Sequence, residues 1–381
     1  GVERCLFGNG KELHFKKLMD FDTIGGKSNK NGARFDLDAM YVNWLGLSLK
    51  CYLPKSENSL SYVWESLKGK ISYCNIKRLM FSSGWRYYAE IVVSGAAPTR
   101  VSIGTSTMGI DPGVSTIAGV SEDACVLEEL APNAIQYEKK IQKISQSMDR
   151  SRRISNPNKY NEDGTINRSN RDPWKYSKNY VKMCRLLKSL YRKKHAYIVD
   201  SHRKLCNKLI TIARYFPVEK MHFQALQKRA KETKRQEKKT EVKQKDGTVK
   251  VIQKYKRKKR FGRSINRRAP ARFLLELKRK AEAVGGVYAE VDTKEFKASQ
   301  YNHVTDTYEK IPLSQREKEI GKRKVQRDLY SAFLIRNADL DFKHPDREKC
   351  EYEFEHFAKM QDQLILKMKE SGLSMRQCFG F

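Results

Sequence analysis

Residues 109–120 read GIDPGVSTIAGV, and this stretch places one carboxylate, that of Asp111, between two apolar runs separated by a Pro-Gly turn. Burying a carboxylate costs on the order of several kcal/mol unless a cation or hydrogen-bond donors compensate for the lost hydration. The neighbouring side chains are aliphatic and offer no such compensation. Two interpretations stay open at this point: Asp111 holds a metal ion, or it starts a tight turn before Pro-Gly.

The segments around Asp111 predict a three-stranded meander followed by a long helix. We expect strands at Thr107–Asp111, Ser115–Val120 and Cys125–Leu130. A meander of this kind opens an RNase H-like domain. Apolar residues then recur with the helical period from Met183 to about Ala213, which predicts a helix that packs on the sheet.

Two more acids lie at the ends of predicted elements. A short buried strand is expected at Tyr215–Glu219, and a helix that opens at Lys324 carries Asp328 in its first turn. Each acid also has a plainer interpretation: Glu219 as a surface acid paired with Lys220, and Asp328 as a first-turn acid favoured by the helix dipole. In an RNase H-like fold, however, the places of the three acids converge.

Together the three acids predict a two-metal site. Carboxylates brought close to one another cannot all ionise without cations, and two Mg²⁺ ions roughly 4 Å apart are the usual solution. We therefore expect Asp111, Glu219 and Asp328 to be both the catalytic residues and the ligands of Mg²⁺ or Mn²⁺. One ion would activate the attacking water and the other would stabilise the leaving oxygen as a phosphodiester is hydrolysed. His222 and His303 are expected to be structural.

The chain is strongly basic, with 77 Lys and Arg against 44 Asp and Glu and a net charge of +33 over 381 residues. Such a charge predicts a polyanionic partner, and nucleic acid is the obvious one. A membrane surface is the competitor, but no run approaches the roughly 18 apolar residues of a spanning helix, and no signal-like segment opens the chain. We expect a soluble, cytoplasmic, nucleoid-associated protein. Because the sequence begins abruptly at Gly1, we also expect an N-terminal part to be missing.

Positive charge is concentrated in residues 228–268, where 19 Lys or Arg accompany 4 acids. We expect this segment to be an extended or disordered loop that orders on a phosphate backbone; a solvated loop without a partner is the alternative. Residues 148–175 are likewise expected to form a loop with exposed arginines. The nucleic-acid-binding side chains predicted from these segments and from the late helix are Arg150, Arg152, Arg153, Lys228, Arg229, Lys256, Arg257, Lys258, Lys259, Arg260, Arg263, Arg267, Arg268 and Arg327.

The expected fold class is α/β plus β. Residues 1–105 contain alternating runs such as Arg86–Val93, which are typical of an antiparallel barrel or sandwich. Residues 106–345 are expected to form the RNase H-like domain, with a basic insertion at 228–268 and an irregular polar stretch at 292–323. Residues 346–381 are expected to form a helical tail. The eight cysteines are scattered without any C-x-x-C pair, so we expect reduced thiols and no zinc.

The motif around Asp111 resembles the first motif of RuvC-like nucleases. With Val218–Met221 and Gln326–Ala332 it looks like the OrfB/TnpB family of transposon-encoded proteins, the ancestors of type V CRISPR effectors. The resemblance covers nearly the whole chain. The further stretches that resemble a Clostridia-type branch of these transposases are Leu6–Gly10, Phe223–Lys231, Lys258–Ser264 and Lys297–His303.

The resemblance implies an RNA-guided DNA endonuclease. In that family a β-barrel wedge domain grips a guide RNA derived from the transposon end, and a RuvC domain cuts the target DNA. Pairing with the guide reads the sequence, while the protein reads backbone shape and a short adjacent motif. By the same resemblance residues 1–105 are the later part of the wedge domain, and the helical recognition insert is absent or cut away.

Two departures from the family stand out. The family commonly has a four-cysteine zinc ribbon between its second and third carboxylates, whereas no Cys lies between Asn207 and Lys349, so a zinc-free loop at about Lys294–Gly321 is expected instead. Lys220 also follows Glu219 where the family usually has a small polar residue. Two alternatives to the guided nuclease therefore stay open: a nuclease-inactive guided DNA-binding protein, and a transposase or resolvase accessory that acts without RNA.

Overall fold

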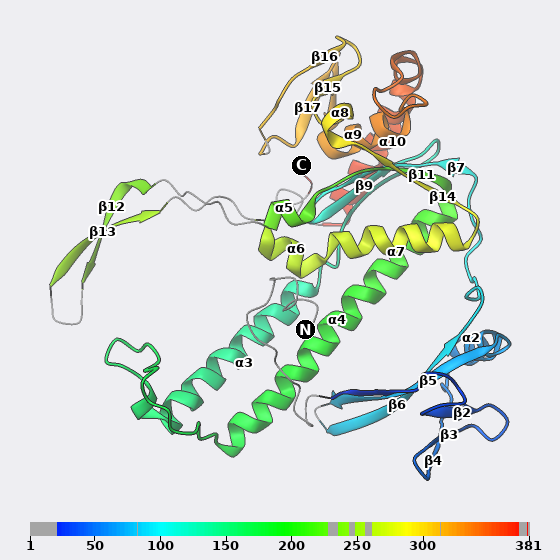
Figure 1. The fold of residues 1–381 in the computed structure, drawn as a ribbon. Helices are drawn as coiled ribbons and strands as arrows, with labels where there is room; N and C mark the ends of the chain where they lie inside the picture. The colour runs from blue at the N-terminus through cyan, green and yellow to red at the C-terminus, as the bar shows by residue number, and fades with distance from the viewer. Residues whose placement is uncertain are drawn as a thin grey trace, which may run out of the picture. The chain divides into compact units, whose positions relative to one another are not determined.

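The computed structural model describes residues 21–81, 83–227, 235–243, 248–255, 261–312, 314–372 and 379. Contacts between residues group the chain into two compact units. Unit 1 comprises Gly1–Pro98 and Lys139–Lys193, and unit 2 comprises Thr99–Glu138 and Lys194–Phe381. Two long helices, α3 (Ala134–Ser155) and α4 (Lys178–Ile212), have residues in both units (Figure 1).

The strands of unit 1 form two antiparallel sheets. The first sheet has the order β1-β5-β6, from Thr23–Gly25, Ile71–Phe81 and Gly84–Val93; the second has the order β2-β3-β4, from Arg34–Asp36, Tyr41–Trp44 and Leu47–Lys50. Helix α2 (Glu57–Leu67) lies between β4 and β5 in sequence, and Phe35, Val42 and Cys74 are in the core. The expected antiparallel β-structure is confirmed, but the described residues form no closed barrel. Strands β2 and β4 each pair on one side only, whereas closure requires two neighbours for every strand.

In the second part of unit 1, the loop expected at residues 148–175 starts later than predicted. Residues 148–155 continue α3 instead of leaving it. Asp149 explains the difference, because its carboxylate accepts hydrogen bonds from Arg152 Nη2 and Arg153 Nε, each at 2.8 Å. Ion pairs spaced three and four residues apart support helix formation. The loop therefore begins after Ser155, with the short 3₁₀ helix η2 (Pro157–Lys159) in it.

Unit 2 is built on a six-stranded mixed sheet. The order β10-β9-β8-β11-β14 comes from Cys125–Glu129, Thr116–Val120, Gly109–Pro112, Ala213–Glu219 and Val287–Val291, and β7 (Ser106–Thr107) also pairs with β11. Strands β8, β9 and β10 are antiparallel neighbours, and β11 runs parallel to β7, β8 and β14. The expected meander, the long helix α4 and the strand that ends at Glu219 are all confirmed.

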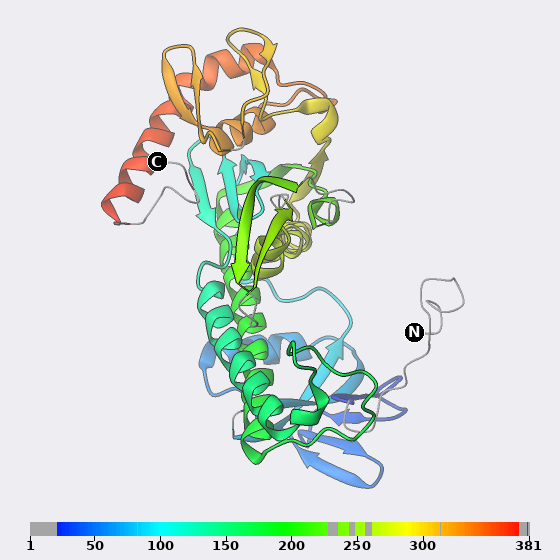
Figure 2. The ribbon, with the colours of Figure 1, turned by 90° about the vertical axis from the view of Figure 1, so that its left-hand side faces the viewer.

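Helices cover both faces of this sheet. Adjacent residues of β9 point to opposite cores: Ile117 packs with α4 and with α7 (Pro270–Ala283), whereas Ala118 packs with α9 (Arg327–Arg336) and α10 (Arg347–Glu370). The two layers are visible on either side of the sheet (Figure 1 and Figure 2). Among the described residues no helix is both long and apolar enough to cross a membrane.

The basic insertion is more ordered than expected. Strands β12 (Arg235–Lys243) and β13 (Val249–Tyr255) form an antiparallel pair, and α6 (Gly262–Arg268) follows, while α5 (Phe223–Gln227) precedes them. The sequence has β-branched residues on both sides of Asp246–Gly247, and that combination favours a hairpin whatever the local charge. Residues 228–234, 244–247 and 256–260 lie outside the described part of the chain.

The stretch 292–323 is also ordered rather than irregular. It contains α8 (Thr293–Phe296) and two hairpins, one from Tyr301–Asn302 (β15) and Thr307–Tyr308 (β16), the other from Glu317–Ile320 (β17) and Arg323–Gln326 (β18). The Lys318 side chain links the hairpins, because its ammonium donates to the backbone oxygens of Gln300 (3.2 Å) and Tyr301 (2.6 Å). Helix α9 consequently begins at Arg327, three residues later than expected.

Candidate functional site

Strand pairing brings Asp111 and Glu219 together. Strands β8 and β11 run parallel with Ile110 opposite Val218, so the next residue of each strand lies at the same end of the sheet. The carboxyl groups of Asp111 and Glu219 are hydrogen-bonded to each other. Glu219 is only 9% exposed, which rules out the surface-acid interpretation of this residue.

Helix α9 adds Asp328 to this pair because of Gly109. A Cβ on Gly109 would overlap the carbonyl oxygen of Ala332 and the backbone nitrogen of Arg336, so only glycine lets α9 come this close to β8. Asp328 is one helical turn before Ala332, and Asp111 is two residues after Gly109, which are similar distances along a helix and a strand. Sequence reasoning missed Gly109, although a glycine inside an apolar strand is a known sign of close backbone approach.

The acids act on one another electrostatically. Burial, then the charges of Glu219 and Asp328, raise the pKa of Asp111 well above its ordinary value, and Arg327 opposes them. Burial also raises the pKa of Glu219; Asp328 adds to this effect, while the hydrogen bond with Asp111 and the charge of Arg327 oppose it. The Asp111–Glu219 pair therefore keeps a shared proton to a higher pH than an isolated carboxyl group would.

Asp328 has two donors of its own. Its Oδ2 accepts from Arg316 Nη1 at 3.3 Å and from Gln326 Nε2 at 3.4 Å. Arg316 comes from the segment just before β17, and neither Arg316 nor Gln326 was singled out from the sequence. Arg316 reaches Asp328 only through the folding of the β17–β18 hairpin, whereas Gln326 lies two residues before Asp328 and was named above only as the start of a motif.

The chemistry of this donor set fits a hard divalent cation. Carboxylate oxygens are the ligands that Mg²⁺ and Mn²⁺ prefer. The charges of Glu219 and Asp328 both raise the pKa of Asp111, and a bound cation would relieve this repulsion. Within the described part of the chain no three carboxyl, imidazole or thiol groups already have the spacing of a metal site. Burial favours the protonated forms of Asp111 and Glu219, whereas a bound cation would favour their ionised forms.

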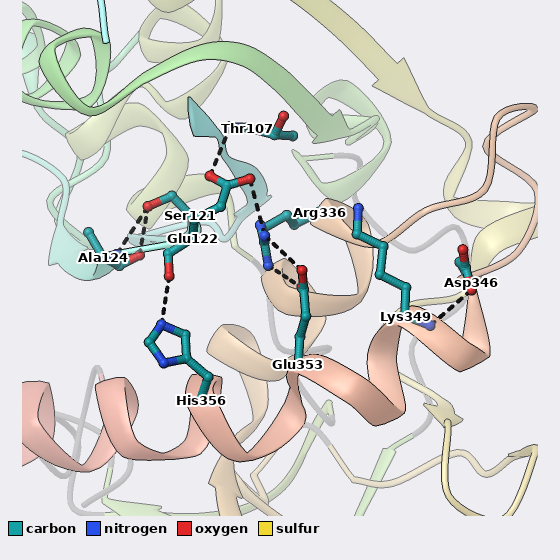
Figure 3. A network of polar contacts seen from close by, with 9 residues as sticks. All are labelled: Thr107, Ser121, Glu122, Ala124, Arg336, Asp346, Lys349, Glu353 and His356. Carbon is teal, nitrogen blue, oxygen red and sulfur yellow. Dashed lines mark hydrogen bonds and ion pairs between the residues drawn. The ribbon is translucent and has the colours of Figure 1, made fainter. Parts of the chain in front are cut away.

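A buried ion-pair network holds the other end of α9 (Figure 3). Arg336, whose side chain is 6% exposed, pairs with Glu122 after β9 at 3.1 Å and with both carboxylate oxygens of Glu353 on α10. Glu122 also accepts from the backbone nitrogen of Thr107 at 3.1 Å, and its carbonyl oxygen accepts from His356 Nε2 at 2.9 Å. The network ties the meander, α9 and α10 into one frame, and so fixes the helix that carries Asp328.

The predicted nucleic-acid contacts in unit 1 lie in different surroundings. Arg150 is exposed. Arg152 and Arg153 are paired with Asp149, and their guanidinium groups lie over the rings of Trp174 (5.4 Å) and Tyr160 (4.6 Å). These two arginines therefore hold the loop after α3 to the helix.

In unit 2 the residues predicted to bind nucleic acid also differ: one is exposed, and others are held in ion pairs within the protein. Arg263 is exposed, whereas Arg267 is paired with Glu138 (2.7 Å) and Arg268 with Glu129, so the last two anchor α6 inside the protein. Arg327 is a counter-charge of the acid pair. The predicted contacts outside the described residues are Lys228, Arg229, Lys256, Arg257, Lys258, Lys259 and Arg260.

Comparison with known proteins gives a likeness to solved structures and no match by sequence. No protein-family model matches the chain, and no curated protein matches it. Among solved structures, the cryo-EM structure of a CRISPR-Cas12f ternary complex is similar, with 14% sequence identity and a TM-score of 0.33 over 77% of this chain. The match covers 49% of the Cas12f chain, so this chain spans about half the length of that protein.

Proposed function

We propose that this protein is a divalent-metal-dependent nuclease that hydrolyses phosphodiester bonds in DNA at Asp111, Glu219 and Asp328. The supporting observation is the convergence of the three acids: Asp111 and Glu219 lie at the same end of the paired strands β8 and β11, and α9, which carries Asp328, packs directly on β8 at Gly109. The net charge of +33 suits a polyanionic substrate, because each neutralised phosphate releases counterions.

The residues of the chain have separate tasks in this proposal. Asp111, Glu219 and Asp328 would hold Mg²⁺ or Mn²⁺, which when bound lowers the pKa of a coordinated water and stabilises charge on a leaving oxygen. The charge of Arg327 opposes the rise in the pKa of both Asp111 and Glu219 and so favours the ionised form in which they can act as ligands. Arg316 and Gln326 hold one oxygen of Asp328 in place.

We further infer that the nuclease is guided by RNA. The support is the sequence resemblance to the OrfB/TnpB family around Asp111, Val218–Met221 and Gln326–Ala332. The partners in this proposal are a guide RNA derived from the transposon end and a target DNA, with the basic insertion 228–268 as a contact to their backbones. RNA extracted from the purified protein should then be a defined species, and bulk cellular RNA in its place would count against guidance.

The test of the nuclease compares two glutamates on neighbouring strands. Glu219→Gln removes a proposed ligand, whereas Glu290→Gln makes the same change on β14, where Glu290 is exposed and paired with Lys220 at 3.3 Å. We expect Glu219→Gln to slow DNA cleavage by about 100-fold or more in Mg²⁺ or Mn²⁺, because a ligand of the reacting centre is lost. Glu290→Gln should cleave at nearly the wild-type rate.

Binding measurements complete this test. Both variants should bind RNA and DNA with wild-type affinity, since neither change lies in the basic insertion 228–268. Equal loss of binding and cleavage in Glu219→Gln would contradict the assignment. Wild-type protein that carries its RNA but never cuts matching DNA in Mg²⁺ or Mn²⁺ would instead favour a guided binding protein.

A further inference from the structure

Gln326 makes an unusual set of contacts just before α9. Its side chain is almost completely buried, with the residue 2% exposed. The amide oxygen accepts from the backbone nitrogen of Leu329 at 2.7 Å and so caps the helix. The amide nitrogen donates both to Asp328 Oδ2 at 3.4 Å and to the carbonyl oxygen of Phe379 at 3.3 Å. One side chain thus joins a helix cap, a site acid and the end of the chain.

The choice of glutamine fits this combination of contacts. Ser, Thr, Asp and Asn are the preferred N-cap residues, and any of them supplies an acceptor for the first turn. Ser, Thr and ionised Asp have no amide nitrogen to donate to both Asp328 and Phe379, and Asn is one methylene shorter. The backbone nitrogen of Gln326 is held as well, because it donates to Gln361 Oε1 on α10 at 2.7 Å. A helix cap alone does not require this residue.

The buried side chain of Phe379 holds in place the carbonyl oxygen that is the second acceptor for the Gln326 amide nitrogen. Phe379 is 7% exposed and belongs to the core cluster that contains Leu329, Phe333 and Phe357. The burial of its ring therefore fixes the carbonyl oxygen that accepts from Gln326. The connection runs from the C-terminal end of the chain, through one amide, to a carboxylate of the candidate site.

The two donors also make the two carboxylate oxygens of Asp328 different from each other. Arg316 and Gln326 both donate to Oδ2, while within the described residues Oδ1 has no hydrogen-bond partner. A carboxylate held at one oxygen by two donors from different elements has little freedom to rotate. Oδ1 is then the oxygen left for a cation shared with Asp111 and Glu219.

We propose that Gln326 is a positioning residue that orients the Asp328 carboxylate for metal binding, and that Phe379 completes this support from the C-terminus. The proposal rests on the function proposed above, because it assumes that Asp328 is a metal ligand. Partners that orient a metal ligand typically change metal affinity by about 10- to 100-fold when they are lost. A residue needed only for folding would change thermal stability and leave the affinity of the folded protein unaltered.

The experiment measures Mn²⁺ binding to the 381-residue chain by calorimetry, together with the thermal unfolding temperature. Gln326→Glu keeps the length and the capping oxygen but replaces the donor nitrogen with an oxygen, and Phe379→Ala removes the anchor of the second acceptor. Gln224→Glu makes the same charge change at an exposed position of α5 and serves as the matched control. We expect Gln326→Glu to weaken Mn²⁺ binding by about 10- to 100-fold. Phe379→Ala should weaken it less, and Gln224→Glu not at all.

Each result has a defined meaning. Wild-type Mn²⁺ affinity in both Gln326→Glu and Phe379→Ala, with Asp328→Asn clearly impaired, would overturn the positioning role and leave the nuclease proposal standing. Wild-type affinity in Asp328→Asn as well would overturn both. If Gln326→Glu fails to fold, Phe379→Ala decides: weaker Mn²⁺ binding in a folded Phe379→Ala supports the proposal, and unchanged binding overturns it.

Discussion

Asp111 and Glu219 form a pair of acids that folding makes harder to ionise. Because burial raises the pKa of both, the folded protein binds a proton that the unfolded chain releases at about pH 4. Stability linked to such a proton is fully present at acidic pH and declines as the pH rises towards the raised pKa values. We therefore expect the contribution of this pair to the free energy of unfolding of the metal-free protein, measured with denaturant in EDTA, to fall from about pH 4 upwards.

The matched variants isolate this contribution. Glu219→Gln removes one of the two charges, so its stability should exceed that of the wild type by a margin that grows with pH. Glu290→Gln should follow the wild-type curve, because Glu290 is exposed on the neighbouring strand. A difference between wild type and Glu219→Gln that stays constant over this range would show that the pair titrates normally.

At the residue scale, the acids could be found from the sequence and their partners could not. Asp111, Glu219 and Asp328 each stand at the end of an apolar element, and a fold class is enough to bring such positions together. Arg316 reaches Asp328 across the β17–β18 hairpin, and Gln326 reaches the far end of the chain. Contacts of this kind depend on how hairpins and tails pack, which has no periodic signal in sequence.

Among the elements, the closest packing in the site is that of α9 against β8 at Gly109. Gly109→Ala would place a methyl group inside contact distance of backbone atoms in α9, and backbone cannot move aside as a side chain can. We expect a loss of about 1 to 3 kcal/mol in the free energy of unfolding, as for other overpacked cores. Gly262→Ala, where a Cβ meets nothing within 4 Å, is the control and should be near neutral. Equal effects of the two substitutions would mean that α9 adjusts freely.

The attachment of α9 to α10 gives a second comparison between elements. Arg336 and Arg323 both pair with acids of α10, but the Arg336 side chain is 6% exposed and that of Arg323 is 39% exposed. Removing the charge of Arg336 leaves Glu353 and Glu122 without their cation, so Arg336→Met should cost about 3 kcal/mol in denaturant unfolding. Arg323→Met should cost about 1 kcal/mol or less, because exposed pairs contribute little. A larger loss for Arg323→Met would contradict the anchoring role of the buried network.

Helices and strands were predicted best where hydrophobic periodicity was not contradicted by another feature of the sequence, such as high charge. The meander and α4 show clear periodicity and are present as expected. In residues 235–255, high charge argued for a loop while β-branched alternation argued for strands, and pairing between the strands decided the outcome. In α3, the pairing of Asp149 with Arg152 and Arg153 extends the helix into residues 148–155, which were expected to begin a loop.

For the whole molecule, the two compact units do not follow the order of the sequence. Residues 139–193 group with the β-sheets of unit 1, although they lie between two segments of unit 2. A boundary placed by composition assumes that a domain is continuous along the chain, and an inserted helical segment breaks that assumption. Predictions that rest on charge do not depend on the domain boundaries, because the net charge is set by the residues present and not by the unit to which they belong.

The basic insertion can therefore be tested through the salt dependence of nucleic-acid binding. Neutralising Z phosphates gives a slope of log affinity against log salt near −0.9Z for duplex DNA and near −0.7Z for single strands. If the insertion contacts the backbone, replacing Lys256, Lys258 and Lys259 with Gln should flatten the slope by about 2 to 3. The control replaces three exposed lysines of α10, Lys359, Lys367 and Lys369, with Gln, which lowers the net charge equally. Equal flattening by both triple variants would mean that the total charge of the chain, and not the insertion, attracts the nucleic acid.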